Sequence, residues 1–181
     1  MFSTISSTLN TTWDIELGSE TAKVQLEKLE RRLKYARQEI VEPHGSMRPA
    51  REIRYIQGTA ELQRLSGLIY LYRVGKKTAS SHPVLQELVR NAFRLLEELK
   101  TCKRTFCLFV VGCEASTDYQ RALVLKVAHR TKTDFLCTVM MRTGQYLERF
   151  WALSDLDIDN RLDHGAKMTA AASISKVPAF L

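Results

Sequence analysis

The feature of this sequence that most constrains its fold is the spacing of its apolar residues, which recur every three or four positions in five segments. In the first segment, Leu26, Leu29, Leu33, Ala36 and Ile40 would share one face of a helix. Such stripes need burial against partner helices, so the sequence predicts an all-α protein, an irregular bundle of about five to seven helices. The five segments cover residues 20–40, 51–74, 84–99, 117–130 and 133–151.

Glycine, proline and capping residues punctuate these helices. Pro43 and Pro49 break the first pattern, because proline cannot donate its backbone N–H and restricts the residue before it. Gly58 and Gly67 lie inside the second helix, where each costs roughly 1 kcal/mol relative to alanine. We expect both to mark the close approach of a neighbouring helix. Thr117–Gln120 has the form of a capping box that opens the next helix.

Phe106 to Cys113 is apolar throughout and has no period. A run of this length is compatible with a strand or with a buried helix, and its Phe and Val content alone favours a strand. The remaining helices lack long interruptions, so we expect one domain. Its parts are a polar amino-terminal segment at 1–20, a helical domain at 21–155, and an acidic segment and tail at 156–181.

Composition narrows the class of protein. No apolar run approaches the roughly 20 residues that cross a bilayer, so we expect no membrane association through a span. The four cysteines are too few and too clustered for a secreted disulfide framework, which favours a reducing compartment such as the cytoplasm. The formal net charge of +7 suits attraction to nucleic acid. The positive and negative residues alternate at helical spacing, however, as they do on ordinary solvated helix faces.

The sequence nominates no catalytic residue, metal site or cofactor. Cys102, Cys107 and Cys113 form no C-x-x-C pair and lack a histidine at a ligand spacing, so we interpret them as core residues. The acids at Asp155, Asp157 and Asp159 match the start of a calcium loop. That loop fails at Asn160 and Ala166, where glycine and glutamate are required. The fourth cysteine is Cys137 and the histidines are scattered, at His44, His82, His129 and His164.

Aromatic residues at core spacing leave two interpretations open. They fill the core by default, and they can also line an apolar pocket between helices. The residues concerned are Tyr70, Tyr72, Phe106, Phe109, Phe150 and Trp151.

Four segments, read in order, resemble one known arrangement. They are ELQRLSGLIYLYRV at 61–74, VLQELVRNAFRLLEEL at 84–99, FCLFVVGCEAS at 106–116 with Arg121 following, and YLERFWALSD at 146–155. Together they are similar to the helical regulatory domain of fungal-specific transcription factors. The resemblance covers roughly 51–155. Its most distinctive parts are the run that ends in Gly112-Cys113-Glu114-Ala115 and the aromatic pair Phe150-Trp151 followed by an acid.

The resemblance implies that residues 106–113 are helical and that the protein acts in the nucleus. Members of that family usually begin with a six-cysteine binuclear zinc cluster that reads DNA, and nothing before Cys102 contains a cysteine. We therefore expect a transcription-regulator-like module without its own sequence-specific DNA reader, acting through a protein partner or a small-molecule effector. Formation of a homodimer stays open.

Two other functions remain as hypotheses. An enzyme or small-molecule-binding protein can reuse the same scaffold, because function resides in sites rather than in folds. Direct binding of nucleic acid through the basic excess would require Lys and Arg side chains of the first two helices to share one face.

Overall fold

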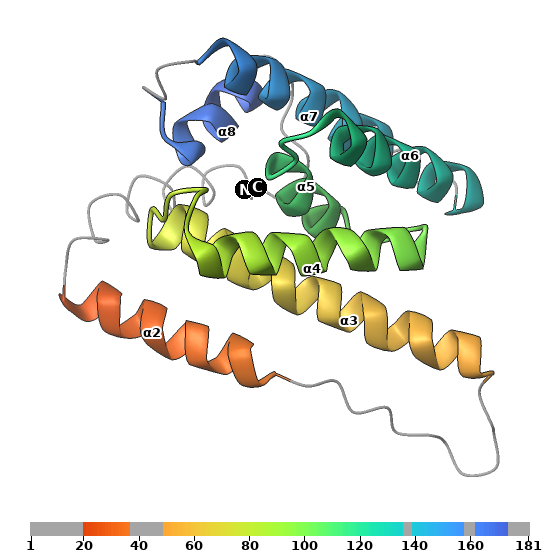
Figure 1. The fold of residues 1–181 in the computed structure, drawn as a ribbon, viewed down its shortest axis with the longest axis horizontal. Coiled ribbons are helices and arrows are strands. Elements are labelled where there is room, and N and C mark those ends of the chain that lie inside the picture. Colours follow the sequence, from red (N-terminus) through yellow and green to blue (C-terminus); the bar gives the residue numbers. More distant parts are fainter. Residues whose placement is uncertain (1–19, 37–48, 136–138, 158–161, 174–181) are drawn as a thin grey trace, which may run out of the picture.

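The computed structural model describes residues 20–36, 49–135, 139–157 and 162–173, and every regular element in that part of the chain is helical. This confirms an all-α, irregular bundle (Figure 1). A π-helix, η1 (Leu71–Gly75), directly continues α3. The α-helices are α2 (Glu20–Tyr35), α3 (Ala50–Tyr70), α4 (Pro83–Leu99), α5 (Thr105–Cys113), α6 (Asp118–Phe135), α7 (Val139–Leu156) and α8 (His164–Ser173).

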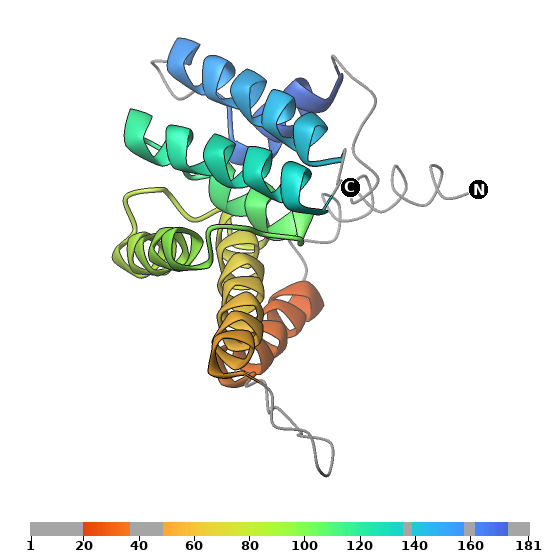
Figure 2. The same ribbon diagram turned by 90° about the vertical axis from the view of Figure 1, so that its right-hand side faces the viewer.

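The helices form two groups with α5 between them (Figure 1). In the lower group, α3 lies between α4 and α2, as the view along the bundle shows (Figure 2). In the upper group, α6 and α7 pack side by side and α8 packs against α7. Helix α5 contacts α3, α4, α6 and α7, so it is the centre about which the two groups assemble.

Helix α5 resolves the ambiguity at Phe106 to Cys113, which is helical as the family resemblance implies. All residues from Cys107 to Cys113 are buried. A helix that is surrounded on every side shows no apolar stripe, which explains why this segment has no period. The strand that Phe and Val propensity favours does not form, because propensity yields to the tertiary environment.

Glycines allow close packing at the positions that the sequence predicts. A Cβ atom on Gly58 would lie 3.0 Å from Leu99 Cδ2, and one on Gly67 would lie 3.4 Å from Leu33 Cδ2. Gly58 thus allows the close approach of α4, whereas Gly67 faces α2 at an ordinary contact distance. The tightest position is Gly112 in α5, where a Cβ atom would lie 2.5 Å from Leu147 Cδ1 of α7.

Replacing Gly112 with alanine is therefore expected to lower the free energy of unfolding by about 1–3 kcal/mol, the usual cost of overpacking a core. Urea titration of the purified protein measures this change. Gly144→Ala in α7 is the matched control, since its Cβ atom would lie at an ordinary 3.5 Å from Leu125 Cδ2. We expect that control to be neutral or more stable. A Gly112→Ala protein as stable as the control would contradict this packing.

The boundary between α6 and α7 differs from the prediction. Thr133 and Asp134, which we expected to open a helix, lie in the last turns of α6, and α7 starts at Val139. The Thr133 hydroxyl donates to His129 O at 3.0 Å within α6, so it is not free to cap a following helix. Residues 37–48, 136–138 and 158–161 lie outside the described part. They include Ile40, His44, Cys137 and Asp159.

The expected acidic segment and tail contains a helix, α8, that apolar periodicity did not reveal. Asp163 caps it, because its Oδ1 accepts the Ala166 backbone N–H at 2.6 Å. Met168 and Ala171 are buried, and the Tyr146 hydroxyl of α7 donates to Met168 O. Helix α8 lacks the long apolar stripe of the other helices, and its contacts with α7 hold it in place instead.

Among the helices that the structure describes, none has the length and apolar character needed to cross a membrane.

Candidate functional site

The α5–α6 junction, residues 112–121, brings together the two motifs that carry the family resemblance. Trp151 of α7 donates its Nε1–H to Gly112 O at 2.8 Å. The carbonyl of Gly112 lies in the last turn of α5 and also accepts the Ala115 backbone N–H at 3.1 Å. The hydrogen bond from Trp151, 39 positions away in the sequence, is a second bond to this carbonyl and fixes α7 against the end of α5.

Arg121 completes this contact from the first turns of α6. Its guanidinium makes two hydrogen bonds with Asp155 of α7, at 2.6 and 2.8 Å, and lies 5.6 Å from the centre of the Trp151 ring. Two-point contact between arginine and a carboxylate fixes both side chains in orientation. The pKa of Asp155 is lowered, chiefly by the hydrogen bonds from Arg121.

The capping box that the sequence predicts is present at the start of α6. Thr117 Oγ1 accepts the Gln120 backbone N–H at 3.2 Å, and Gln120 Oε1 accepts the Thr117 N–H at 3.3 Å. Gln120 Oε1 also accepts the Ser116 N–H at 2.9 Å. These bonds hold the junction in one conformation between two packed helices.

A buried charge cluster lies beside the junction, and its centre is Arg73 of η1. The Arg73 Nε–H donates to Glu114 Oε1 at 2.8 Å, Nη1 donates to Thr78 O at 2.9 Å, and Nη2 lies 2.9 Å from His164 Nδ1. Only 6% of the Glu114 side chain and 9% of the His164 side chain are exposed. The cluster therefore connects three elements, η1, the end of α5 and the start of α8.

The protonation states in this cluster follow from burial and from the Arg73 cation. Burial raises the pKa of Glu114, and Arg73 opposes that rise. Burial and, after it, the cations Arg73 and Lys167 together lower the pKa of His164 to about 3, against the opposing effect of Asp163. A neutral His164 ring accepts the Arg73 N–H at Nδ1 and carries its proton on Nε2.

The low pKa of His164 makes the stability of the protein acid-sensitive. Because the folded pKa is about 3 and the usual value is 6.5, protonation favours the unfolded chain as the pH falls below about 6.5. Between pH 7 and pH 5 this group should remove about 2 kcal/mol from the free energy of unfolding.

Urea titrations of the protein and of His164→Asn at both pH values measure that loss. Glu114 has a raised pKa, so its titration acts in the opposite direction as the pH falls. Glu30 has a pKa lowered to about 2 and titrates below this window. The variant should show a smaller loss than the parent. Equal losses in the two proteins would contradict a neutral buried His164.

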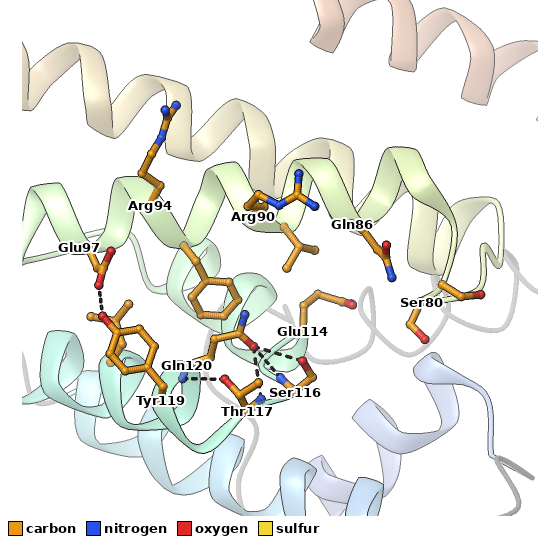
Figure 3. Close-up of a pocket in the computed structure, with 14 residues that line it drawn as sticks. Ser80, Gln86, Arg90, Arg94, Glu97, Glu114, Ser116, Thr117, Tyr119 and Gln120 are labelled. Carbon is orange, nitrogen blue, oxygen red and sulfur yellow. Dashed lines mark hydrogen bonds between the residues drawn. The ribbon is translucent and has the colours of Figure 1, made fainter.

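An open groove of about 680 Å³ runs between α4 and the junction (Figure 3). Its α4 wall carries Gln86, Arg90, Arg94 and Glu97, with the two arginine side chains directed away from the junction in Figure 3. Its opposite wall carries hydroxyl and amide groups of the junction and of α6. Val89, Phe93 and Leu123 supply its apolar lining, and Glu114 reaches it from the charge cluster. The polar residues of the opposite wall are Ser116, Thr117, Tyr119 and Gln120.

The aromatic residues that the sequence left between core and pocket belong to the core. Tyr72, Phe109, Phe150 and Trp151 are buried, and none of them lines the groove. Phe109 meets Tyr146 edge to face with ring centres 4.9 Å apart. Tyr70 and Phe106 are partly buried and form a similar pair at 5.7 Å.

The other candidate residues serve the fold. Cys102, Cys107 and Cys113 are free and buried, which confirms the interpretation as core residues. Burial raises the pKa of all three thiols. Asp155 pairs with Arg121, and Asp157 lies 3.0 Å from Lys167.

Sequence reasoning missed Arg73 and did not connect His164 to any partner. Arg73 is the single charged residue in the otherwise apolar run 68–74, and a charge within such a run is a signal for a buried, paired group. His164 lies 91 positions from it, and no local pattern reports that distance.

Comparison of the sequence with known proteins identifies the family. The fungal specific transcription factor domain matches residues 1–165. Among curated proteins, the transcription factor iacI of Pestalotiopsis fici is 29% identical over 113 residues, which are 62% of this chain and 29% of that protein. The chain thus spans less than a third of that relative. No solved structure matches the chain.

The match covers most of the sequence, including the α5–α6 junction and the residues that contact it from α7. The chain therefore belongs to the family of fungal-specific transcription factor domains.

Proposed function

We propose that this chain is a helical regulatory module of a fungal transcription factor and acts in the nucleus by binding a protein partner in the groove between α4 and the junction. The observation that carries the proposal is the groove itself. It joins an arginine-bearing wall, an apolar lining and a wall of hydroxyl and amide groups on an open surface. Mixed polar and apolar surfaces of this kind are typical of non-obligate protein interfaces.

A protein partner fits the groove better than a small effector does. Small-molecule sites are enclosed and predominantly apolar, and they bury most of the ligand. This groove is open, and the aromatic residues that could have lined an enclosed site are packed into the core. Capping bonds and the contacts of Arg121 hold the junction wall in place, which reduces the entropic cost of binding.

The module is not proposed to read DNA sequence. The chain has four cysteines, fewer than the six of a binuclear zinc cluster, and at least three of them are buried in the core. The relative from Pestalotiopsis fici is described as a transcription factor, and the aligned part is 29% of its length. The proposal therefore does not extend to which genes the whole protein regulates.

Tethering the chain to a heterologous DNA-binding domain in a fungal host tests the regulatory role. Reporter output should rise or fall relative to the DNA-binding domain alone, because the tethered module recruits its partner to the promoter. Output indistinguishable from that of the DNA-binding domain alone, with equal amounts of both proteins, would refute the proposal.

The second candidate is an enzyme or small-molecule-binding protein on the same scaffold. The observation that favours it is the cluster of Glu114, which lines the groove, and His164 behind it, because the pKa values of both groups are shifted. Both groups are engaged by Arg73, however, and structural ion pairs also shift pKa values. A ligand that copurifies with the protein and is lost from Glu114→Gln would favour this candidate.

A further inference from the structure

A group of basic residues gathers at one end of the bundle, away from the groove. Figure 1 shows the start of α3, the end of α4 and the end of α6 at the same side of the molecule. The segment that joins α4 to α5, residues 100–104, lies at this end. We call this surface the basic end and define it by Arg54, Lys100, Lys103, Arg104, Arg130 and Lys132.

One buried hydrogen bond holds most of these residues together. The Cys102 N–H donates to Thr131 Oγ1 at 2.9 Å and so ties the 100–104 segment to α6. Lys103 directly follows Cys102, and Arg130 and Lys132 flank Thr131. The Thr131 hydroxyl in turn donates to Val127 O at 2.7 Å, so it both accepts and donates a buried hydrogen bond.

The backbone of the 100–104 segment is fixed at both ends. Lys100 adopts a left-handed conformation, with φ of 62°, and its N–H donates to Leu96 O at 3.1 Å. Arg104 immediately precedes α5, and its carbonyl accepts the Leu108 N–H at 3.2 Å. The charges are therefore carried by a preorganised loop.

Helix α3 adds a further cation. Gly58 packs against Leu99 at the end of α4, and Arg54 lies one helical turn before Gly58. Arg54, Lys100, Lys103, Arg104 and Arg130 are exposed, and Lys132 is half-buried.

Positive charge at the basic end is not balanced locally. Lys103 has an interaction of its own, and apart from it the stretches 98–105 and 129–134 contain the acids Glu98 and Asp134 against four Lys or Arg. Apart from Lys103, no residue of the basic end forms an ion pair within the described part of the chain. Elsewhere the cations are often neutralised, as Lys34 and Lys76 are by Glu30.

We propose that the basic end binds the phosphate backbone of duplex DNA without reading its sequence. Lys and Arg side chains on a fixed surface release counterions condensed on DNA, and this effect requires neither a pocket nor apolar contact. No large apolar residue is exposed within 98–105 and 129–134, and the nearest ones in the sequence, Val139 and Met141, lie in the first turn of α7. The surface is distinct from the groove, which includes none of its six residues.

The structure does not support the alternative in which the first two helices share one basic face. Leu26 and Leu33 of α2 pack against Gly75 and Gly67, near the end of α3, whereas Arg54 lies near its beginning. The α2 cations therefore form a separate surface and provide a control.

Fluorescence anisotropy with a labelled duplex of about 20 base pairs tests the proposal, using the full chain over a series of salt concentrations. We expect a dissociation constant of roughly 10⁻⁶ to 10⁻⁴ M near physiological salt, independent of DNA sequence. Each phosphate contact contributes about −0.9 to the slope of log K against log salt, so the slope should be −2.7 or steeper for three or more contacts.

The decisive comparison uses two variants that lose the same charge. Lys100→Gln/Arg104→Gln/Arg130→Gln should bind at least about tenfold more weakly at 0.1 M salt and show a shallower slope by about 2 to 3. Lys28→Gln/Arg31→Gln/Arg32→Gln, on the exposed face of α2, should keep most of the affinity.

Three results would overturn the proposal. The first is a wild-type slope shallower than about −2.7, which needs no variant and is unaffected by folding defects. The second is equal weakening by the two variants, which would assign binding to net charge alone. The third is binding to phosphatidylserine vesicles without binding to DNA, which would make the partner a membrane.

Discussion

Replacing Arg73 with methionine is expected to lower the free energy of unfolding by roughly 3–5 kcal/mol, the usual cost of removing one partner from a buried ion pair. The change leaves Glu114 with 6% of its side chain exposed and without its cation, and removes the donor to His164 Nδ1. Urea titration at pH 7 measures the loss. Arg90→Met, which breaks an exposed pair with Glu87, should cost no more than about 1 kcal/mol.

A double-mutant cycle assigns this loss to the pair. Arg73→Met/Glu114→Gln removes both charges, so it should be less destabilised than the sum of the single changes. A loss below about 1 kcal/mol for Arg73→Met would contradict a buried ion pair that stabilises the contact between η1 and α5. Additive losses would mean that Arg73 acts through Thr78 and His164 rather than through Glu114.

Truncating Trp151 should have an effect of the same size. Trp151→Ala is expected to cost roughly 3–5 kcal/mol, because it leaves a large cavity beside α5 and removes the ring that Arg121 covers. Trp151→Phe keeps a ring but removes the indole hydrogen bond to Gly112 O, which retains the Ala115 N–H, and should cost about 0.5–1.5 kcal/mol.

The control for Trp151 is Tyr119→Ala, which truncates an aromatic side chain that is 66% exposed. We expect a change within about 0.5 kcal/mol there. Unfolding followed by far-ultraviolet circular dichroism separates the three variants. Equal stability of Trp151→Ala and Tyr119→Ala would mean that α7 does not depend on the junction.

Local sequence patterns predicted much of the fold. The five periodic segments correspond to α2, α3, α4, α6 and α7, and Gly58 and Gly67 lie where neighbouring helices approach. The capping box at Thr117 and Gln120 was predicted because all of its atoms lie within four residues. Periodicity and capping are local properties, so a sequence reports them directly.

The charge cluster was not predictable in the same way. Arg73, Glu114 and His164 come from three distant segments, and each looks like an ordinary charged or polar residue in its own surroundings. Helix α8 was missed because Met168 and Ala171 become buried only after it docks on α7. The end of α6 was misplaced because the Thr133 hydroxyl bonds back to its own helix.

The groove also depends on tertiary structure. Its walls come from α4 and from the α5–α6 junction, and they meet only because α5 holds the two groups of helices together. The family resemblance identified the junction by its residues without indicating that a groove lies beside it.

The measurement that tests the central claim most directly is reporter output from the tethered module carrying Arg90→Glu and Arg94→Glu, which reverse the charges on the α4 wall of the groove. The control is Lys126→Glu/Arg142→Glu, two exposed cations on α6 and α7 that do not line the groove. If the groove binds the partner, the first protein loses regulation and the control keeps it. Equal output from both variants, at equal protein levels, would contradict the assignment of this groove as the partner site.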